Sequence, residues 1–278
     1  QPAARGPSKL GLHTILPNNA VGFVQGVHEA GACVAIVKAF NDLGYLRAVK
    51  ESSPDTVTVG RRGVSFVDPE GDPAKAAARV MRQHMPGWEY ERDVVDYWEV
   101  LNENDPPTVE GHVWLARFYI EAMAIAENND YRLAIFSYSV GVPSWAEWAA
   151  IVETGVFARA QQGGHILALH EYNWPTMDYR WGEQMPGQPV YDDRGVLTGR
   201  YRYLYGDFLI PRGEVVPLAI TECGLDPVLW TSGQPTNHWR ERFVEEMIWY
   251  DTRLREDDYV LGAAMFTVGG AWGWQSYD

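Results

Sequence analysis

Short apolar runs alternate with amphipathic segments along almost the whole of this 278-residue chain. Eight runs rich in Val, Ile, Leu and Ala predict strands at 10–16, 33–40, 56–61, 96–103, 133–139, 165–172, 216–222 and 260–268. Segments between them predict helices at 18–31, 41–51, 72–95 with a break at Pro86 and Gly87, 108–129, 144–162, 199–210 and 236–255. Alternating strands and helices form a parallel sheet, and eight such units predict an α/β protein with a (β/α)8 barrel.

The chain runs only ten residues past the last predicted strand, so either the barrel lacks its eighth helix or the sequence ends before it. A chain of 278 residues with 46% hydrophobic residues can bury one large core. We therefore expect a single catalytic domain over residues 1–278.

The net charge of −14 argues against nucleic acid, anionic membrane surfaces and acidic polysaccharides as partners, because all three attract Lys and Arg clusters. No stretch approaches the roughly 18 apolar residues of a membrane span, and the first residues lack the apolar core of a signal peptide. We expect a mature extracellular form without its signal peptide, and a cytoplasmic location stays open.

Cysteine and histidine positions favour neither a disulfide nor a metal site. Cys33 opens one predicted strand and Cys223 closes another, which places the thiols near opposite ends of a parallel barrel, so we expect both to be free. The seven histidines show no paired ligand spacing. We therefore expect neither a metal nor a cofactor.

Two predicted strands run straight into a glutamate, Glu103 at the end of the fourth and Glu222 at the end of the seventh. An isolated buried charge is costly, so such a strand end should open onto water or a substrate. Two carboxylates at one barrel mouth could supply the acid and the nucleophile of glycosidic bond cleavage. Glu103 and Glu222 are the predicted catalytic residues.

Strand alternation predicts which other side chains point into the barrel. The inward sets are Glu99, Leu101 and Glu103; Leu218, Ile220 and Glu222; Ala168, His170 and Tyr172; and Val57, Val59 and Arg61. Arg61, His170 and Tyr172 could hold a carboxylate ionised beside the glutamates. Taken singly, Arg61 could pair on the surface beside Arg62, His170 could be a core residue, and Glu99 could be the buried partner of a basic group.

Two long connections, 173–198 and 223–235, follow strands and would lie at the carboxyl face, where barrel enzymes carry their sites. They contain several aromatic residues, of which Trp174 and Trp230 are candidate contacts for the apolar faces of a sugar. Packing within the loops is the alternative for each ring.

Three short motifs resemble those of clan A glycoside hydrolases. GluValLeuAsnGlu at 99–103 is similar to the clan's fourth-strand signature, HisGluTyr at 170–172 to its sixth-strand motif, and IleThrGluCysGly at 220–224 to its nucleophile motif. The resemblance implies that Asn102 holds the sugar 2-hydroxyl, Glu103 is the acid/base, Tyr172 supports the nucleophile and Glu222 is that nucleophile. Trp272 would lie under the scissile sugar, although Trp274 has the same parity.

The chain also departs from the clan's pattern. Many relatives have a proline directly after the acid/base, where this chain has Asn104 and reaches proline only at Pro106. The clan's further active-site histidine and second arginine have no secure equivalents, and His13 on the first strand is a weak candidate. No individual family is assigned.

These features together predict a retaining hydrolase of β-linked neutral oligo- or polysaccharides that uses double displacement, with endo action favoured. Retention predicts carboxyl groups about 5–5.5 Å apart. A transglycosylase with the same residues is one alternative, and a non-catalytic glycan-binding barrel is another. The oligomeric state stays open.

Overall fold

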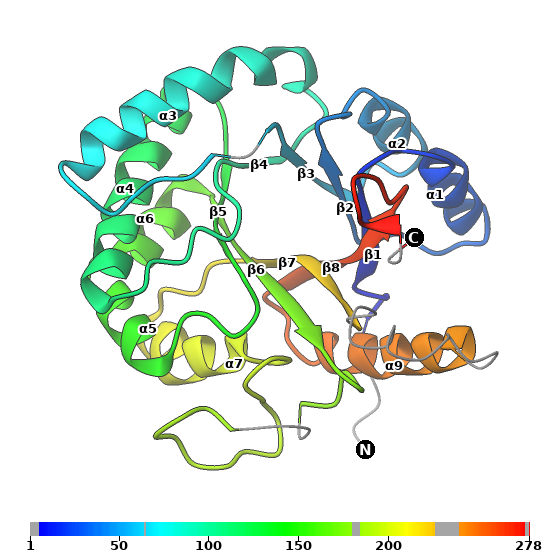
Figure 1. The fold of residues 1–278 in the computed structure, drawn as a ribbon. Coiled ribbons are helices and arrows are strands. Elements are labelled where there is room, and N and C mark those ends of the chain that lie inside the picture. Colours follow the sequence, from blue (N-terminus) through cyan, green and yellow to red (C-terminus); the bar gives the residue numbers. More distant parts are fainter. Residues whose placement is uncertain (1–5, 64, 180–183, 226–238, 276–277) are drawn as a thin grey trace.

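The computed structural model describes residues 6–63, 65–179, 184–225, 239–275 and 278. Eight strands form a closed, entirely parallel barrel in which each strand pairs with the next along the chain and the last pairs with the first (Figure 1). The strands are β1 Leu10–Thr14, β2 Ile36–Phe40, β3 Val57–Arg61, β4 Tyr97–Glu99, β5 Leu133–Tyr138, β6 Ile166–Asn173, β7 Leu218–Leu225 and β8 Val260–Val268. The predicted (β/α)8 barrel is confirmed.

Helices surround the barrel on its outer side (Figure 1). They are α1 Ala20–Glu29, α2 Leu46–Ser52, α3 Pro73–Trp88, η1 Glu89–Glu91, α4 Val109–Glu127, α5 Trp145–Val152, α6 Val156–Gly163, α7 Tyr201–Leu204, η2 Tyr205–Leu209, α8 Ile210–Arg212 and α9 Trp239–Leu254. In the part of the chain that the structure describes, no helix follows β8. Every described helix is also too short or too polar to cross a membrane.

The structure divides one predicted helix and joins another across its predicted break. The segment 144–162 is two helices, because Gly155 adopts a left-handed conformation with φ of 77° between α5 and α6. The predicted break at Pro86 is wrong, since α3 continues to Trp88. Pro86 lies near the end of α3, so its ring removes a single helical hydrogen bond, the one to the carbonyl of Arg82, without ending the helix.

Small apolar side chains fill the middle of the barrel. This inner cluster consists of Ile36, Val59, Ala134, Ile166, Ala168, Ala219 and Ala264. The much larger apolar cluster packs between strands and helices and includes Leu218 and Ile220. The charged residues of the interior lie in the layer above the small ones, towards the carboxyl ends of the strands.

A β-bulge in β7 changes the predicted facing of that strand. Ala219 belongs to the inner cluster whereas Leu218 and Ile220 pack outward, so the predicted inward parity of Leu218 and Ile220 is wrong. The register of β7 shifts between Ile220 and Cys223, and this shift turns Glu222 to the inside. Glu222 thus reaches its predicted place by a bulge rather than by simple alternation.

The fourth strand is shorter than predicted. β4 ends at Glu99, and Glu103 lies four residues beyond it, with a left-handed φ of 48°. The backbone N–H of Glu103 donates to the carbonyl of Ser137 at 2.9 Å, which holds this segment beside β5 although it is no longer extended. The two cysteines are free thiols, as expected.

Candidate active site

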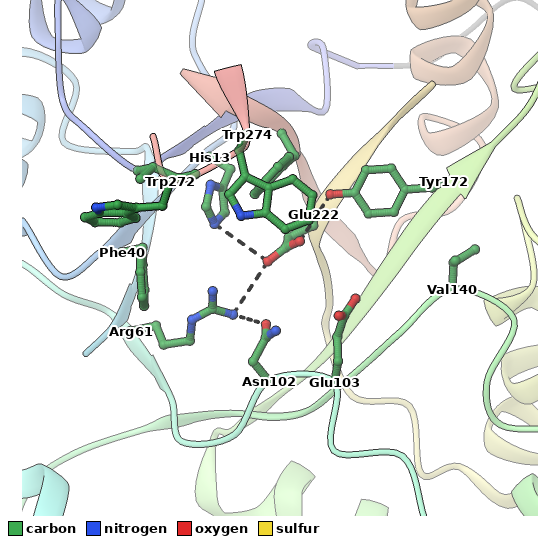
Figure 2. Close-up of a pocket in the computed structure, with 12 residues that line it drawn as sticks. His13, Phe40, Arg61, Asn102, Glu103, Val140, Tyr172, Glu222, Trp272 and Trp274 are labelled. Carbon is green, nitrogen blue, oxygen red and sulfur yellow. Dashed lines mark hydrogen bonds and ion pairs between the residues drawn. The ribbon is translucent and has the colours of Figure 1, made fainter. Parts of the chain in front are cut away.

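A cavity of about 350 Å³ opens at the carboxyl ends of the strands, with the two predicted glutamates in its wall (Figure 2). Each of the eight strands contributes to its lining, either directly or through the segment that follows it, as expected for a barrel mouth. The lining residues are His13, Ile15, Phe40, Arg61, Asn102, Glu103, Val140, Tyr172, Glu222, Phe266, Trp272 and Trp274.

Glu103 and Glu222 face each other beside His170. A carboxylate oxygen of each glutamate and a ring nitrogen of His170 all lie within 4.8 Å of one another. Nδ1 of His170 is 2.9 Å from Oε1 of Glu103 and 3.7 Å from Oε2 of Glu222. The Glu103 side chain is 42% exposed and the Glu222 side chain 9%, so the pair combines a solvent-accessible carboxyl group with a buried one.

Two cationic side chains and an imidazole surround Oε1 of Glu222. The Lys38 ammonium lies 3.0 Å away, the Arg61 guanidinium 3.5 Å and Nε2 of His13 3.7 Å. Burial by itself raises the pKa of Glu222, but His170, Lys38, His13 and Arg61 outweigh burial and hold that pKa well below its usual range. Glu222 is therefore ionised at neutral pH.

The other oxygen of Glu222 faces Tyr172. The Tyr172 hydroxyl donates to Oε2 at 3.1 Å. Burial, and then the charge of Glu222, raise the pKa of Tyr172 well above its usual value, so the hydroxyl keeps its proton and acts as a donor. The contact predicted between these two residues is present.

A second carboxylate lies beneath Glu222, at the end of β4. Glu99 is fully buried, with Oε2 2.9 Å from the Lys38 ammonium and Oε1 accepting from the Ser137 hydroxyl at 2.9 Å. Burial opposes ionisation, yet Lys38 and Arg61 lower the pKa of Glu99 to about 2. Glu99 is therefore the buried partner of basic groups, which was the alternative left open for it.

Asn102 is held by Arg61 next to the glutamates. A guanidinium nitrogen of Arg61 donates to Oδ1 of Asn102, and the amide NH2 remains available on the other side of the side chain. Arg61 also lies over the Phe40 ring, 4.8 Å from its centroid. It therefore contacts the wall of the cavity and lies within 3.5 Å of Glu222.

Aromatic rings form the wall opposite Glu103 (Figure 2). Trp272 is 68% exposed, and its ring meets Phe40 edge-on with centroids 6.3 Å apart. Trp274, 46% exposed, also lines the cavity, so both tryptophans left open by parity are present there. Trp174 is half-buried and is not among the described residues that line the cavity, and Trp230 lies outside the described residues.

Lys38 is the functional candidate that sequence reasoning missed. It lies in the strand AlaIleValLysAlaPhe, and its side chain is fully buried between Glu99 and Glu222. A lysine inside an apolar strand is itself a signal, because a buried ammonium needs a charged partner. His13, only a weak candidate from sequence, contacts the site as well.

Glu103, His170 and Glu222 also form a geometric candidate for a metal site, the one such group found among the described residues. However, Lys38 and Arg61 already lie within 3.5 Å of Oε1 of Glu222. A divalent cation at Glu222 would meet both positive charges, so the electrostatics disfavour a metal here.

Neither the models of protein families nor the curated protein sequences contain a match to this chain. Solved structures that match this chain were found. The chain is similar to a family 39 glycoside hydrolase from the gut symbiont Bacteroides cellulosilyticus WH2, with a TM-score of 0.56 and 13% identity over 98% of this chain and 59% of that one. It thus spans less than two thirds of that protein.

Two further structures have similar scores. XacCel5A, solved in complex with cellopentaose, has a TM-score of 0.54 and 14% identity over 95% of this chain and 91% of its own. The endo-β1,6-glucanase BT3312 has a TM-score of 0.51 and 10% identity over 95% of this chain and 68% of its own. The chain therefore shares its (β/α)8 barrel fold with these glycoside hydrolases.

Proposed function

We propose that this protein is a retaining glycosidase that hydrolyses β-linked neutral glycans by double displacement. The observation that carries the proposal is the pair of carboxylates, Glu103 and Glu222, with oxygens within 4.8 Å of each other across the cavity. This separation favours direct attack over inversion, in which a water must fit between carboxyl groups about 6.5–9.5 Å apart. The barrel shared with glycoside hydrolases supports the same proposal.

Glu222 is the proposed nucleophile, because its surroundings keep it ionised and Tyr172 orients it. In the first step Glu222 forms a bond to the anomeric carbon, the bond to the leaving oxygen breaks, and Glu103 gives that oxygen its proton. In the second step water attacks the same carbon, Glu103 takes the proton of the water, and the electron pair returns to Glu222. His170 is placed to orient Glu103 through the 2.9 Å contact.

The proposed substrate is a neutral glycan bound by aromatic rings. In the deepest layer the charges of Lys38 and Arg61 balance those of Glu99 and Glu222, which leaves no surplus cation for an acidic sugar. Trp272 offers an exposed ring for the apolar face of a sugar. In this proposal Asn102 binds the sugar 2-hydroxyl.

Endo action, an extracellular location and a single catalytic domain over residues 1–278 belong to the same proposal. The cavity opens beside the exposed rings of Trp272 and Trp274, which would let a chain extend beyond the cleaved bond. The net charge of −14 agrees with a neutral partner.

The test is hydrolysis of a panel of neutral β-linked polysaccharides and aryl β-glycosides, with the configuration of the first product followed by NMR. We expect the β-anomer to appear first. First appearance of the α-anomer would refute retention. Transfer products that dominate at high substrate would show a transglycosylase, and glycan binding without turnover on any member would show a binding barrel.

A further inference from the structure

Lys38 is shared by two carboxylates. Its ammonium lies 2.9 Å from Oε2 of Glu99 and 3.0 Å from Oε1 of Glu222, and the Lys38 and Glu99 side chains are completely buried. Ser137 fixes the far oxygen of Glu99 at 2.9 Å. One cation thus joins the proposed nucleophile to a carboxylate that has no path to the substrate.

The two half-reactions change the charge on only one side of Lys38. When Glu222 becomes a glycosyl ester it loses its negative charge, and Glu103 gains that charge as it gives up its proton. Glu99 stays ionised throughout, because Lys38 and Arg61 keep its pKa near 2. Lys38 therefore has two charged partners in the free enzyme and one in the glycosyl-enzyme.

We propose that Lys38 and Glu99 are positioning residues with opposite effects on the two half-reactions, an inference that rests on the proposed double displacement. Lys38 stabilises the ionised form of Glu222, so it favours departure of that carboxylate in the second step. The negative charge of Glu99 offsets part of the positive potential of Lys38 at Glu222. The ionised form of Glu222 is therefore stabilised less, which lowers the barrier of the first step, in which Glu222 loses its charge.

The attraction between Lys38 and Glu222 depends on how much negative charge Glu222 carries at each stage of the reaction. The attraction between Lys38 and Glu222 is strongest in the free enzyme, weaker in each transition state and lost in the ester. Removing the Lys38 charge therefore raises the barrier from ester to product and leaves the first barrier unchanged or lower. Removing the Glu99 charge strengthens the hold of Lys38 on Glu222 and raises the first barrier.

The experiment compares K38M and E99Q with wild type on a dinitrophenyl β-glycoside whose sugar is taken from the substrate panel. For K38M we expect kcat to fall about 10- to 100-fold, because losing one hydrogen bond to a charged group slows a step by about this factor. We expect kcat/KM, which reports the first step, to change less than about 3-fold. A burst of one dinitrophenol per enzyme and a mass increase of one glycosyl unit should accompany it. For E99Q we expect kcat/KM to fall about 10-fold or more, without a burst or added mass.

K50M is the matched control, since Lys50 forms an ion pair with Asp96 at 2.5 Å and does not line the cavity. K50M should change neither kcat nor kcat/KM. The proposal is overturned if K38M and E99Q shift the two half-reactions in the same direction, or if K38M lowers kcat/KM as much as kcat. If K38M does not fold, E99Q alone decides, because a burst in E99Q contradicts the proposal. Failure of the proposed function is distinct, since wild type would then cleave no member of the panel.

Discussion

The Tyr172 hydroxyl and Oε2 of Glu222 are joined by a 3.1 Å hydrogen bond between neighbouring strands. The register pairs Glu222 with His170 and Tyr172 with Gly224, so the ring of Tyr172 reaches back along the strands to meet the carboxylate. With Oε1 held by Lys38, both oxygens of Glu222 have fixed partners. The rotation of the carboxylate is therefore set before a substrate arrives.

Tyr172→Phe keeps the ring and removes this donor only. We expect turnover to fall about 10- to 100-fold, because a hydrogen bond to a charged group contributes roughly 1.5–3 kcal/mol. The thermal midpoint should change little. Tyr205→Phe is the matched control: it removes a buried 2.8 Å bond to the carbonyl of Val216, away from the cavity, and should leave turnover unchanged. Unchanged turnover in Tyr172→Phe would assign this residue to barrel packing.

The two glutamates should respond differently to truncation. Glu222→Ala should abolish turnover on every substrate, because no other group can form the glycosyl ester. Glu103→Ala should retain the first step for aryl glycosides with good leaving groups, which need no proton. Azide should then rescue the second step and give a β-glycosyl azide, identified by NMR. Equal loss on activated and unactivated substrates, with no rescue, would remove Glu103 from the acid/base role.

The barrel could be predicted from the sequence because strand and helix periods alternate so regularly along it. The site followed partly from the same argument, since Arg61, His170 and Tyr172 all face inward as alternation requires. Alternation failed where the backbone is irregular. The bulge in β7 re-aims Glu222, and the positive φ at Glu103 turns that residue after β4 has ended. Local sequence pattern does not encode either feature.

Lys38 shows a different limit. Its apolar neighbours predicted a buried strand correctly, but the partners that make its burial tolerable lie 61 and 184 residues further along the chain, at Glu99 and Glu222. Such a pairing depends on which strands become neighbours across the barrel interior. Sequence shows that a buried lysine needs an anion, and only the closed barrel shows which one.

Trp272 and Trp274 can be separated by single substitutions. Trp272→Ala removes the more exposed ring, which offers the larger free surface for a sugar, so we expect KM to rise about 3- to 10-fold with little change in kcat. Trp274→Ala should have the smaller effect on KM. Tyr90→Ala removes an exposed ring that does not line the cavity and serves as the control. A larger rise in KM for Trp274→Ala would mean that Trp274, and not Trp272, is the main contact for the sugar.

Glu171 links the stability of the barrel to pH. It is buried outside the site, where its carboxyl group accepts from the Tyr250 hydroxyl at 2.7 Å and from the N–H of Arg200 at 3.1 Å. Burial raises the pKa of Glu171 to about 7, although these donors act in the opposite direction. In the unfolded chain the pKa is about 4.3. The protonated carboxyl therefore stabilises the fold fully below pH 4.3, and this contribution is lost as the pH rises to about 7.

Glu171→Gln cannot ionise, so it should lose none of this stability with pH. We expect the free energy of unfolding of the variant, relative to wild type, to rise by about 3 kcal/mol between pH 4 and pH 8, because each unit of pKa shift corresponds to about 1.4 kcal/mol. Denaturant unfolding at a series of pH values measures this difference. A difference that stays constant over the range would mean that the Glu171 carboxyl ionises in the folded barrel as readily as in water, with Tyr250 and Arg200 compensating fully for its burial.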